Sequence, residues 1–254
     1  MVDKEAAMLM QSGADATRLF GYGDRAECRL LANGAIALSG EPAADLNMIF
    51  LTGDASREEF AESLEAVRLK GVDAILVVQE GADAVRAWAG EAGLQEVGQM
   101  PLMEHDDEAG PASDLTVRLG SAKEMDEAMR VAAAAFELDE AACLGAMPPA
   151  FIEREGNDLW LAEEDGKQIG VGIFIRTGEH VGVYTMATPP AQQRRGIGGA
   201  ILNCAMAHYR ERGAKRFTLG ATEKGFPLYE RVGFKVMAMP HVYVIGASTQ
   251  FGGG

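Results

Sequence analysis

The sequence is poor in several features that would point to particular classes of protein. It holds only three cysteines among 254 residues, and Cys28, Cys143 and Cys204 are widely spaced. No Cys-x-x-Cys pair occurs, and none of the four histidines stands at a ligand spacing from a cysteine. These absences argue against a disulfide framework and against a structural zinc site. We therefore expect a reduced, cytoplasmic protein without a metal.

Basic residues and long apolar runs are also scarce. Lys and Arg number 23 against 38 Asp and Glu, which gives a formal net charge of −15. This balance argues against binding to nucleic acid or anionic membranes, because both require a basic surface. No run of about 18 apolar residues is present to span a bilayer. The charged start at residues 1–5 lacks the apolar core of a signal peptide. We expect no nucleic-acid or membrane partner.

What is present is typical of a folded protein with two domains. Hydrophobic residues make up 48% of the chain and charged residues 24%, which are values for a globular protein. An acidic stretch broken by Gly110 and Pro111 is typical of a linker. We predict a first domain at 1–104, a linker at 105–113, a second domain at 114–247 and a flexible tail at 248–254.

Helices and strands alternate in both predicted domains, which indicates an α/β (α+β) fold. In the first domain, Ser56 and Glu59 have the spacing of a capping box that opens a helix. The predicted strands of this domain are 46–51, 74–78 and 94–103, and its helices are 56–70 and 82–92. In the second domain we predict strands at 115–119, 159–162, 169–175, 181–187 and 217–221, one or two more strands within 234–245, and helices at 124–136, 140–146, 196–212 and 227–231.

One run of elements occurs twice. The order strand, helix, strand, helix, Gly, strand recurs at an offset of about 140 residues, with Ala92-Gly93-Leu94 before Met100-Pro101 and Val232-Gly233-Phe234 before Met239-Pro240. This pattern favours a diverged internal duplication. The alternative is two unrelated α/β units that share a common order of elements.

The segment that carries chemistry is a glycine-bearing turn between a strand and a helix. The first turn of a helix leaves backbone N–H groups without partners inside the helix, and the helix dipole makes that end attractive to anions. Gly196, Gly198 and Gly199 present no side chain that would block a phosphate, and Arg194 and Arg195 add positive charge. The pattern indicates a diphosphate site. The alternative is a helix start whose glycines serve only to pack it closely on a sheet.

Two common diphosphate motifs do not fit this turn. A dinucleotide fingerprint would place Gly or Ala at Ile201, and an acidic residue at the end of the next strand. That strand, predicted at 217–221, ends without an acid. A nucleoside-triphosphate loop would continue with Gly-Lys-Ser or Gly-Lys-Thr, and no such sequence follows.

A different family carries a matching pair of motifs. Gln193-x-x-Gly196-x-Gly198 resembles the Q/R-x-x-G-x-G/A signature of the GCN5-related N-acetyltransferases, the GNAT superfamily. About 30 residues later, the run that ends in Leu228-Tyr229-Glu230-Arg231-Val232-Gly233-Phe234 is similar to the second signature of that superfamily. The resemblance covers residues 115–245. It implies two tandem GNAT-like domains, each with a mixed, mostly antiparallel sheet flanked by helices.

The resemblance also implies a cofactor and the residues that bind it. The cofactor is acetyl-coenzyme A (acetyl-CoA), which serves as co-substrate. In the family, the strand before the glycine turn offers backbone groups to the thioester and the pantetheine arm, and it diverges from the next strand. The N–H groups of the turn bind the diphosphate. The corresponding cofactor-binding residues here are Met186, Ala187, Thr188, Gln193, Arg194, Arg195, Gly196, Ile197, Gly198 and Gly199.

By the same resemblance, Tyr229 is the catalytic acid that protonates the leaving thiolate. Its alternative role is an aromatic plug on the short helix. Many family members carry Asn seven residues before this tyrosine, where this chain has Thr222. Contacts expected from that Asn are therefore in doubt.

An attacking amine must also lose a proton, so a general base or a water chain to one is expected. The candidates are Glu179, His180, Glu223, Glu137 and Asp139. Each is as compatible with an ordinary surface charge, and we assign the role to none of them. His208 follows Ile197, Ile201 and Cys204 at helical spacing, which predicts packing on the core face of that helix.

The first domain lacks the glycine turn. Its counterpart segment carries Asp54, Glu58 and Glu59, which would repel a diphosphate. We predict that this domain binds no cofactor and is a scaffold, either completing the acceptor pocket or forming the surface of a homodimer.

The charge is distributed unevenly along the chain. Residues 186–235 hold 9 basic and 3 acidic residues, whereas residues 113–185 hold 6 and 14. The basic excess coincides with the predicted cofactor segment, and the acidic excess with the elements expected around the acceptor. We therefore predict transfer of an acetyl group to a small cationic amine, with direct attack in a ternary complex implied by the resemblance. The alternatives are a longer acyl group and a CoA-binding sensor or structural module without turnover.

Overall fold

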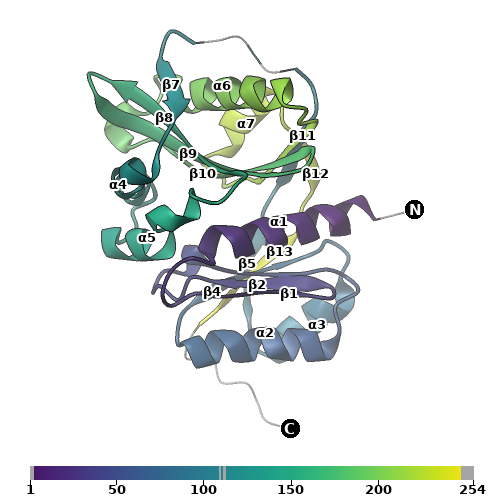
Figure 1. Cartoon of the computed structure of the whole chain (residues 1–254). Helices are drawn as coiled ribbons and strands as arrows, with labels where there is room; N and C mark the ends of the chain where they lie inside the picture. Colours follow the sequence, from purple (N-terminus) through teal and green to yellow (C-terminus); the bar gives the residue numbers. More distant parts are fainter. Residues whose placement is uncertain (1–2, 109, 111–112, 247–254) are drawn as a thin grey trace. The chain divides into compact units, whose positions relative to one another are not determined.

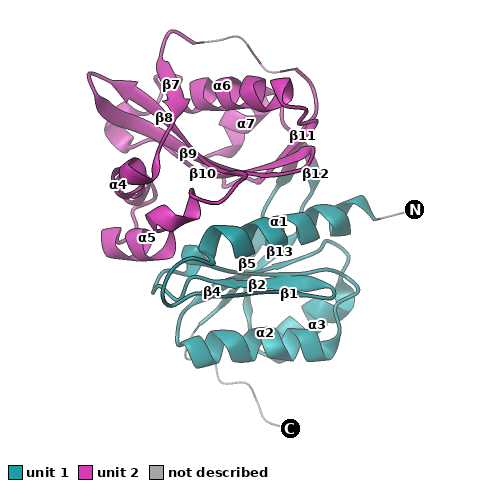
Figure 2. Ribbon diagram, viewed as in Figure 1, with its two compact units in different colours: residues 1–102, 237–254 teal, residues 103–236 magenta. Residues whose placement is uncertain are grey.

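The computed structural model describes residues 3–108, 110 and 113–246, so the predicted tail at 248–254 lies outside the described residues. The chain divides into two compact units, which are coloured separately in Figure 2. Unit 1 comprises residues 1–102 and 237–254, and unit 2 comprises residues 103–236. Each unit contains one mixed, mostly antiparallel sheet, which confirms the predicted fold class.

Unit 1 is a six-stranded sheet with helices on both faces. The strand order is β1-β2-β3-β4-β13-β5, with β3 and β4 parallel and the other pairs antiparallel. Helix α1 covers one face, and α2 and α3 cover the other (Figure 1). The bounds are α1 Lys4–Phe20, β1 Glu27–Leu31, β2 Gly34–Leu38, β3 Asn47–Leu51, α2 Arg57–Lys70, β4 Ala74–Val78, α3 Asp83–Glu91, β5 Gln95–Gln99 and β13 His241–Ile245, with a 3-10 turn η1 at Ala44–Leu46.

Local signals explain where the helices of unit 1 begin. The Asp3 carboxylate accepts hydrogen bonds from the first N–H groups of α1, and it serves as the N-cap. Ser56 and Glu59 form the predicted capping box of α2, each side chain accepting from the other residue's backbone N–H. Helix α1 lies very close to the sheet because Gly13 has no side chain. A Cβ there would stand 2.7 Å from the Cβ of Ala35.

Unit 2 is a seven-stranded sheet with the order β12-β6-β11-β10-β9-β8-β7. Strands β7 to β10 pair antiparallel in succession, and β10 and β11 pair parallel. Helices α6 and α7 lie over one face, and α4 and α5 over the other (Figure 1). The bounds are β6 Leu102–His105, β7 Thr116–Leu119, α4 Met125–Phe136, α5 Glu140–Ala146, β8 Asn157–Glu164, β9 Lys167–Thr177, β10 His180–Ala187, α6 Ile197–Glu211, β11 Arg216–Gly220, α7 Phe226–Val232 and β12 Lys235–Ala238, with 3-10 turns η2 Ala122–Glu124, η3 Pro149–Phe151 and η4 Pro190–Gln192.

Glycines in β9 set how closely α6 approaches the sheet of unit 2. A Cβ at Gly170 would lie 2.4 Å from Cγ2 of Ile197, and one at Gly172 would lie 3.2 Å from Cγ2 of Ile201. The core on this face also contains Trp160, whose indole N–H donates to the Tyr209 hydroxyl at 3.3 Å. The ring of His208 lies 5.1 Å from that of Trp160. His208 is therefore half-buried and packs against Trp160, on the face of α6 that its helical spacing predicts.

The two halves of the sequence exchange one strand each. Strand β6 follows the elements of unit 1 along the chain but lies between β12 and β11 in the sheet of unit 2. Strand β13 follows the elements of unit 2 but lies between β4 and β5 in the sheet of unit 1. The units therefore differ from the predicted division, because residues 237–247 were placed with the second domain. An exchange of this kind leaves no local signal, since each strand has an ordinary apolar pattern.

The exchange follows the predicted repeat. In unit 1 the order β3, α2, β4, α3, β5 matches β10, α6, β11, α7, β12 in unit 2, and the exchanged strand lies second from the edge in both sheets. The chain leaves each half at a Met-Pro step, Met100-Pro101 or Met239-Pro240. The prediction of one strand over 94–103 was wrong, because Pro101 separates β5 from β6. The elements α1, β1 and β2 had no counterpart among the predictions.

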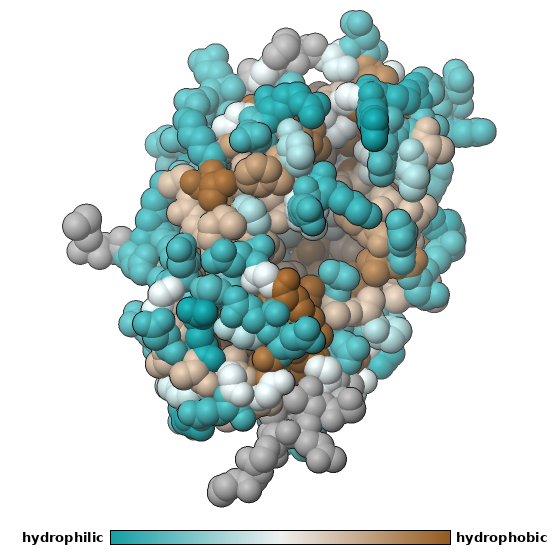
Figure 3. Space-filling view, turned by 180° about the vertical axis from the view of Figure 1, so that it is seen from behind, coloured by the Kyte–Doolittle hydropathy of each residue, from teal (hydrophilic) through white to brown (hydrophobic). Residues whose placement is uncertain are grey.

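Hydrophilic residues occupy much of the molecular face in Figure 3, with smaller hydrophobic areas between them. The three cysteines are free thiols. Among the described residues, no helix has both the length and the apolar character needed to cross a membrane.

Candidate functional site

The candidate site is built where two parallel strands of unit 2 part. Strand β10 pairs with β11 only through His180–Gly182, opposite Arg216–Thr218. Beyond these three pairs β10 continues to Ala187 and β11 to Gly220 without a further ladder between them. Both strands keep their polar backbone groups there, so this opening can receive an extended ligand that hydrogen-bonds to the main chain.

A bulge lies in the part of β10 that extends beyond its ladder with β11. Tyr184 pairs with Ile173 of β9, and the next registered pair is Ala187 with Val171, so β10 carries one extra residue. Thr185 lies in this bulge with φ of +46°, which is an unusual backbone conformation for a β-branched residue. Its hydroxyl is 3.8 Å from the Met147 sulfur. Such a bulge redirects the main chain at Thr185 and Met186, beside the opening.

The predicted glycine turn follows β10 directly. The backbone is left-handed at Arg194, with φ of +62°, and at Gly196, with φ of +78°. The Gln193 side chain donates through Nε2 to the Thr188 carbonyl oxygen at 3.2 Å, so it closes the loop back on itself. The turn is therefore held in one shape by local contacts.

The first turn of α6 has open donors. Gly196 stands at the N-cap position, and no side chain accepts from the N–H groups of this helix start. The first intrahelical bond runs from Ala200 N to Gly196 O at 2.9 Å. The N–H groups of residues 197–199 thus have no carbonyl four residues before them in the helix, and they make an anion-binding end.

Gly198 brings a second helix to this end. A Cβ at Gly198 would lie 2.7 Å from Cδ2 of Leu228 in α7, so the two helices meet closely because this position is glycine. Tyr229 is the next residue of α7. The predicted cofactor residues on β10, in the turn and in α6 are therefore adjacent to the helix that carries the predicted acid.

Tyr229 lies mostly inside the protein. Its side chain is 8% exposed, and its ring packs against Phe234 with centroids 5.9 Å apart. Gly225 faces the same ring, since a Cβ there would lie 2.9 Å from Cε2 of Tyr229. Burial raises the pKa of the phenol to about 12. The hydroxyl consequently remains protonated over the whole physiological range, which suits a proton donor and is equally compatible with a packed aromatic residue.

The candidate bases fall into two groups. Glu179 pairs with Lys215 at 2.7 Å, and His180 is buried with Nε2 2.7 Å from the Thr218 hydroxyl. Burial lowers the pKa of His180 to about 4. Both stand at the start of β10, six residues or about 20 Å of strand before Met186, so they do not reach the bulge.

The second group lies on the segments that follow α4 and β11. Glu137 ends α4 with a left-handed backbone, and its carboxylate is 4.0 Å from the Lys224 ammonium in the segment that follows β11. Glu223 and Asp139 are exposed, and the Asp139 carboxylate caps α5 through Ala142 N. The contact between Glu137 and Lys224 joins the segment after α4 to the segment after β11.

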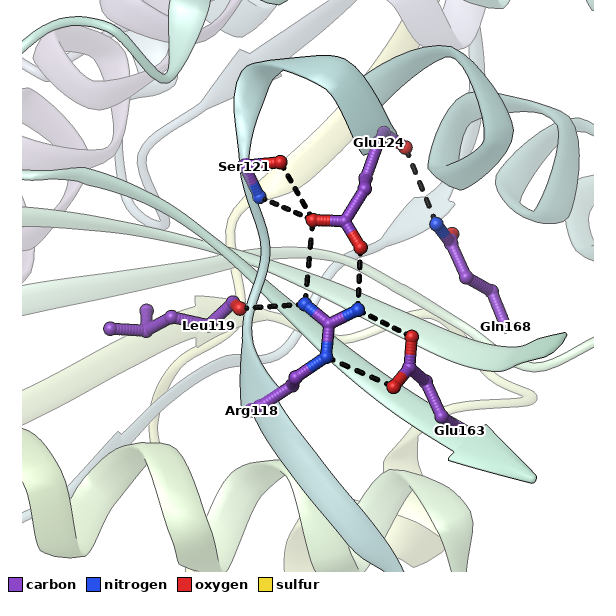
Figure 4. Close-up of polar contacts among 6 residues, drawn as sticks. All are labelled: Arg118, Leu119, Ser121, Glu124, Glu163 and Gln168. Atoms are coloured by element: carbon purple, nitrogen blue, oxygen red, sulfur yellow. Dashed lines mark hydrogen bonds and ion pairs between the residues drawn. The ribbon is translucent and has the colours of Figure 1, made fainter. Parts of the chain in front are cut away.

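Two ion-pair groups flank the β8–β9 turn. Arg195 donates to Glu164 at 2.5 Å and also to the Gln192 side chain. Next to it, Arg118 of β7 bridges Glu124 of η2 and Glu163 of β8 (Figure 4). Arg118 lowers the pKa of Glu124 to about 2, and Ser121 contributes in the same direction.

Thr185, Glu164 and the two glycines of β9 are not among the residues predicted from the sequence. Gly170 and Gly172 carried a signal, because glycine inside a strand often marks the close approach of another segment. Thr185 and Glu164 carried none, since a bulge and a partner 31 residues away leave no local pattern. Within residues 3–108, 110 and 113–246, no group of three or more His, Cys, Asp or Glu side chains is placed to hold a metal ion.

Comparison with known proteins bears on this geometry. Residues 155–236 match the family model of the acetyltransferase (GNAT) domain. The matched range begins before β8 and ends in β12, so it contains β10, the glycine turn and α7. A search of curated proteins finds no significant match.

Solved structures extend the similarity to the whole chain. A GCN5-related N-acetyltransferase from Kribbella flavida is 19% identical, with 100% of this chain and 98% of that one covered and a TM-score of 0.63. A protein assigned to the GNAT family from Novosphingobium aromaticivorans is 14% identical, with coverage of 96% and 98% and a TM-score of 0.62. A tandem GNAT protein from the clavulanic acid biosynthesis pathway is 12% identical, with coverage of 98% and 97% and a TM-score of 0.59. At these identities the similarity establishes a shared tandem fold.

Proposed function

We propose that this protein is an acetyl-CoA-dependent N-acetyltransferase, because residues 155–236 match the family model of the acetyltransferase (GNAT) domain and the chain shares the fold of a tandem GNAT protein. The observation that carries the proposal is the uncapped, glycine-bearing start of α6 at the end of the strand that parts from its neighbour. We also place the protein in the cytoplasm, supported by its free thiols.

The residues present fit the proposed co-substrate. A diphosphate requires several donors and no opposing side chain, and the start of α6 offers the N–H groups of residues 197–199 beside glycine. A pantetheine arm requires main-chain partners along an extended path, and Met186 and Ala187 at the end of β10, with Thr188 after it, lie beyond the ladder to β11 and can offer them. We assign the ten predicted residues from Met186 to Gly199 to this binding role.

Acetyl-CoA, when bound, supplies an acetyl group activated as a thioester. The main chain at the bulge of β10 holds this group, and a backbone N–H near Met186 stabilises the charge that develops on its oxygen. Tyr229 holds its proton because burial disfavours the phenolate, and it transfers that proton to the departing sulfur. The neutral form of the amine would attack the thioester carbonyl, and the C–S bond would break as Tyr229 protonates the sulfur. The proton that the amine nitrogen loses would return through water to the Tyr229 phenolate, and no covalent intermediate on the protein is required.

The acceptor is a small cationic amine. Residues 113–185 carry 6 basic and 14 acidic residues, and they include α4, α5 and the segment between them. Among these, Glu137, Asp139 and Glu140 are exposed at the end of α4 and the start of α5. An acidic rim attracts a protonated amine and repels an anionic one.

The proposal assigns cofactor binding to unit 2 alone and a supporting role without cofactor to unit 1. The segment of unit 1 that corresponds to the glycine turn carries Asp54 and Glu58 in place of arginine and glycine. Carboxylates at this position oppose a diphosphate.

The test is release of free thiol when the purified chain is mixed with acetyl-CoA and a panel of amines. We expect release with polyamines or other cationic amines and not with neutral or anionic ones, at a rate that falls as salt increases. Tight CoA binding without thiol release with any amine would support the sensor alternative instead. Turnover with butyryl-CoA but not acetyl-CoA would indicate the longer acyl donor.

A further inference from the structure

The two adjacent arginines of the glycine turn have different surroundings. Arg195 is bound on both sides, to the Glu164 carboxylate at 2.5 Å and to the Gln192 side chain. For Arg194, which is exposed, no ion pair or side-chain hydrogen bond occurs within the described part of the chain. The charge of Arg195 is thus already matched by an acid, whereas that of Arg194 is not.

Arg195 also occupies a special place in the backbone. It lies between Arg194 and Gly196, both of which have a left-handed backbone. Such a segment has several alternative shapes open to it unless side-chain contacts select one. The contacts of Arg195 run to the end of β8 and to η4, so they tie the turn to two neighbouring elements.

We infer that Glu164 is a positioning residue for the diphosphate site: it holds Arg195 as a brace that fixes the turn, while Arg194 is the arginine that meets the phosphates. This inference rests on the proposed binding of CoA. The brace presents the N–H groups of α6 in one arrangement before the ligand arrives, and preorganisation of this kind increases affinity without a direct contact.

The test compares Glu164→Gln, Arg195→Ala and the double variant by calorimetric titration with CoA. Each single change is expected to weaken CoA binding about threefold, and the double variant no more than either, because the two residues act as one brace. Arg194→Ala is expected to weaken binding about tenfold and to reduce its salt dependence, because a charged contact to phosphate is lost. Glu163→Gln is the matched control, because Glu163 pairs with Arg118 and not with Arg195. This substitution is expected to leave CoA affinity unchanged.

A second measurement separates positioning from general stability. Glu164→Gln should raise the KM for acetyl-CoA with kcat unchanged, and leave the KM for S-acetylpantetheine, which lacks the diphosphate, unaltered. Hydrogen exchange of the Ala200 amide, which donates to Gly196 O at 2.9 Å across the turn, should be faster without CoA in Glu164→Gln and Arg195→Ala than in Glu163→Gln.

Three results would overturn the inference: tighter CoA binding by Glu164→Gln, additive losses in the double variant, or an equal KM increase for both acyl donors. The first would mean that Glu164 competes with the phosphates for Arg195. If the unmodified chain bound no CoA at all, the proposed function itself would fail, and the brace with it.

Discussion

The parallel strands β3 and β4 of unit 1 stay hydrogen-bonded to their ends, whereas the parallel strands β10 and β11 of unit 2 separate. Strands β3 and β4 pair from Met48–Ile75 to Leu51–Val78, and the ladder is extended by Gln79 N donating to Leu51 O at 3.1 Å. The Gln79 side chain then accepts from Gly53 N at 2.7 Å. In unit 2 the corresponding pair, β10 and β11, has only three registered positions. Main-chain groups that are free for a ligand in one unit are therefore already bonded in the other.

The helix that follows shows the same contrast. In α2, the Ser56 hydroxyl accepts from Glu59 N at 3.1 Å and the Glu59 carboxylate accepts from Ser56 N at 2.8 Å. In α6, no side chain caps the start. A capping box satisfies with the chain's own oxygens the donors that an anion would otherwise bind. In unit 1 the corresponding helix start therefore has donors already bonded to the chain's own oxygens.

The position of the proposed acid completes the comparison. When Gly93 is aligned with Gly233, Tyr229 of α7 corresponds to Ala89 of α3, which is fully buried and carries no hydroxyl. The comparison teaches that a repeated fold retains its strand order while its chemistry is decided by a few local contacts. The predictions below test that contrast, beginning with the largest expected effect.

Replacing Tyr229 with Phe removes the hydroxyl from α7, so that this position, like Ala89 of α3, has no proton donor. We expect kcat with the best acceptor amine to fall about 100-fold or more, with CoA affinity unchanged, because loss of a general acid affects the reaction step. Steady-state kinetics and calorimetry measure the two quantities. Tyr209→Phe is the control, since that buried hydroxyl donates to Asp158 at 2.6 Å and is expected to affect stability only. An unchanged kcat across the pH range would leave Tyr229 as packing.

Introducing a carboxylate at Gly196 gives the start of α6 the acidic character of the α2 start. Gly196→Asp is expected to weaken CoA binding about 50-fold, because a like charge then faces the diphosphate. Gly196→Ala is the matched control, which introduces the same left-handed strain at φ of +78° without the charge and is expected to lose no more than about fivefold. Equal losses in the two variants would show that strain, not charge, governs the site.

The number of bound cofactors tests the comparison directly. Calorimetric titration with CoA should give one site per chain, since the helix after the parallel strand pair starts without a side-chain cap in unit 2 and with a capping box in unit 1. Gly196→Asp should remove that site without exposing a second one. A stoichiometry of two would contradict the proposed role of unit 1.

Unit 2 also has a capping box, formed by Ser121 and Glu124 at the start of η2, and its contribution to stability should be lost in acid. Arg118 holds the pKa of Glu124 at about 2, below the ordinary value of 4.5. A lowered folded-state pKa stabilises the protein above pH 4.5, and this contribution is lost as the pH falls from 4.5 towards 2. Glu124→Gln is therefore expected to cost about 1 kcal/mol at pH 7 and much less near pH 3. Thermal melts at both pH values measure this, and a cost that did not change with pH would contradict it.

Much of the fold could be predicted from the sequence because the signals are local. Helix α5 begins and ends at the predicted residues 140 and 146, and the capping box of α2 forms between the two predicted side chains. The fold class and the GNAT resemblance are confirmed. The ten cofactor residues and Tyr229 stay predictions, although the structure gathers their elements around one opening.

What could not be predicted depends on partners far apart in the chain. The exchange of β6 and β13 requires knowledge of both sheets, and the brace between Glu164 and Arg195 joins residues 31 positions apart. The bulge at Thr185 arises because β10 must satisfy β9 while it leaves β11. None of these alters the hydrophobic period that sequence reasoning uses.

The strand exchange has a consequence for biosynthesis. A ribosome releases β4 and β5 well before β13, which supplies the strand between them near the end of the chain. Until that segment emerges, the sheet of unit 1 exposes two unsatisfied edges, and such edges recruit other strands. Completion of the sheet of unit 1 thus waits for the segment that follows unit 2 to be translated. A chain truncated before residue 241 would lack β13 and would lose the folded structure of unit 1, although unit 1 contains none of the proposed catalytic residues.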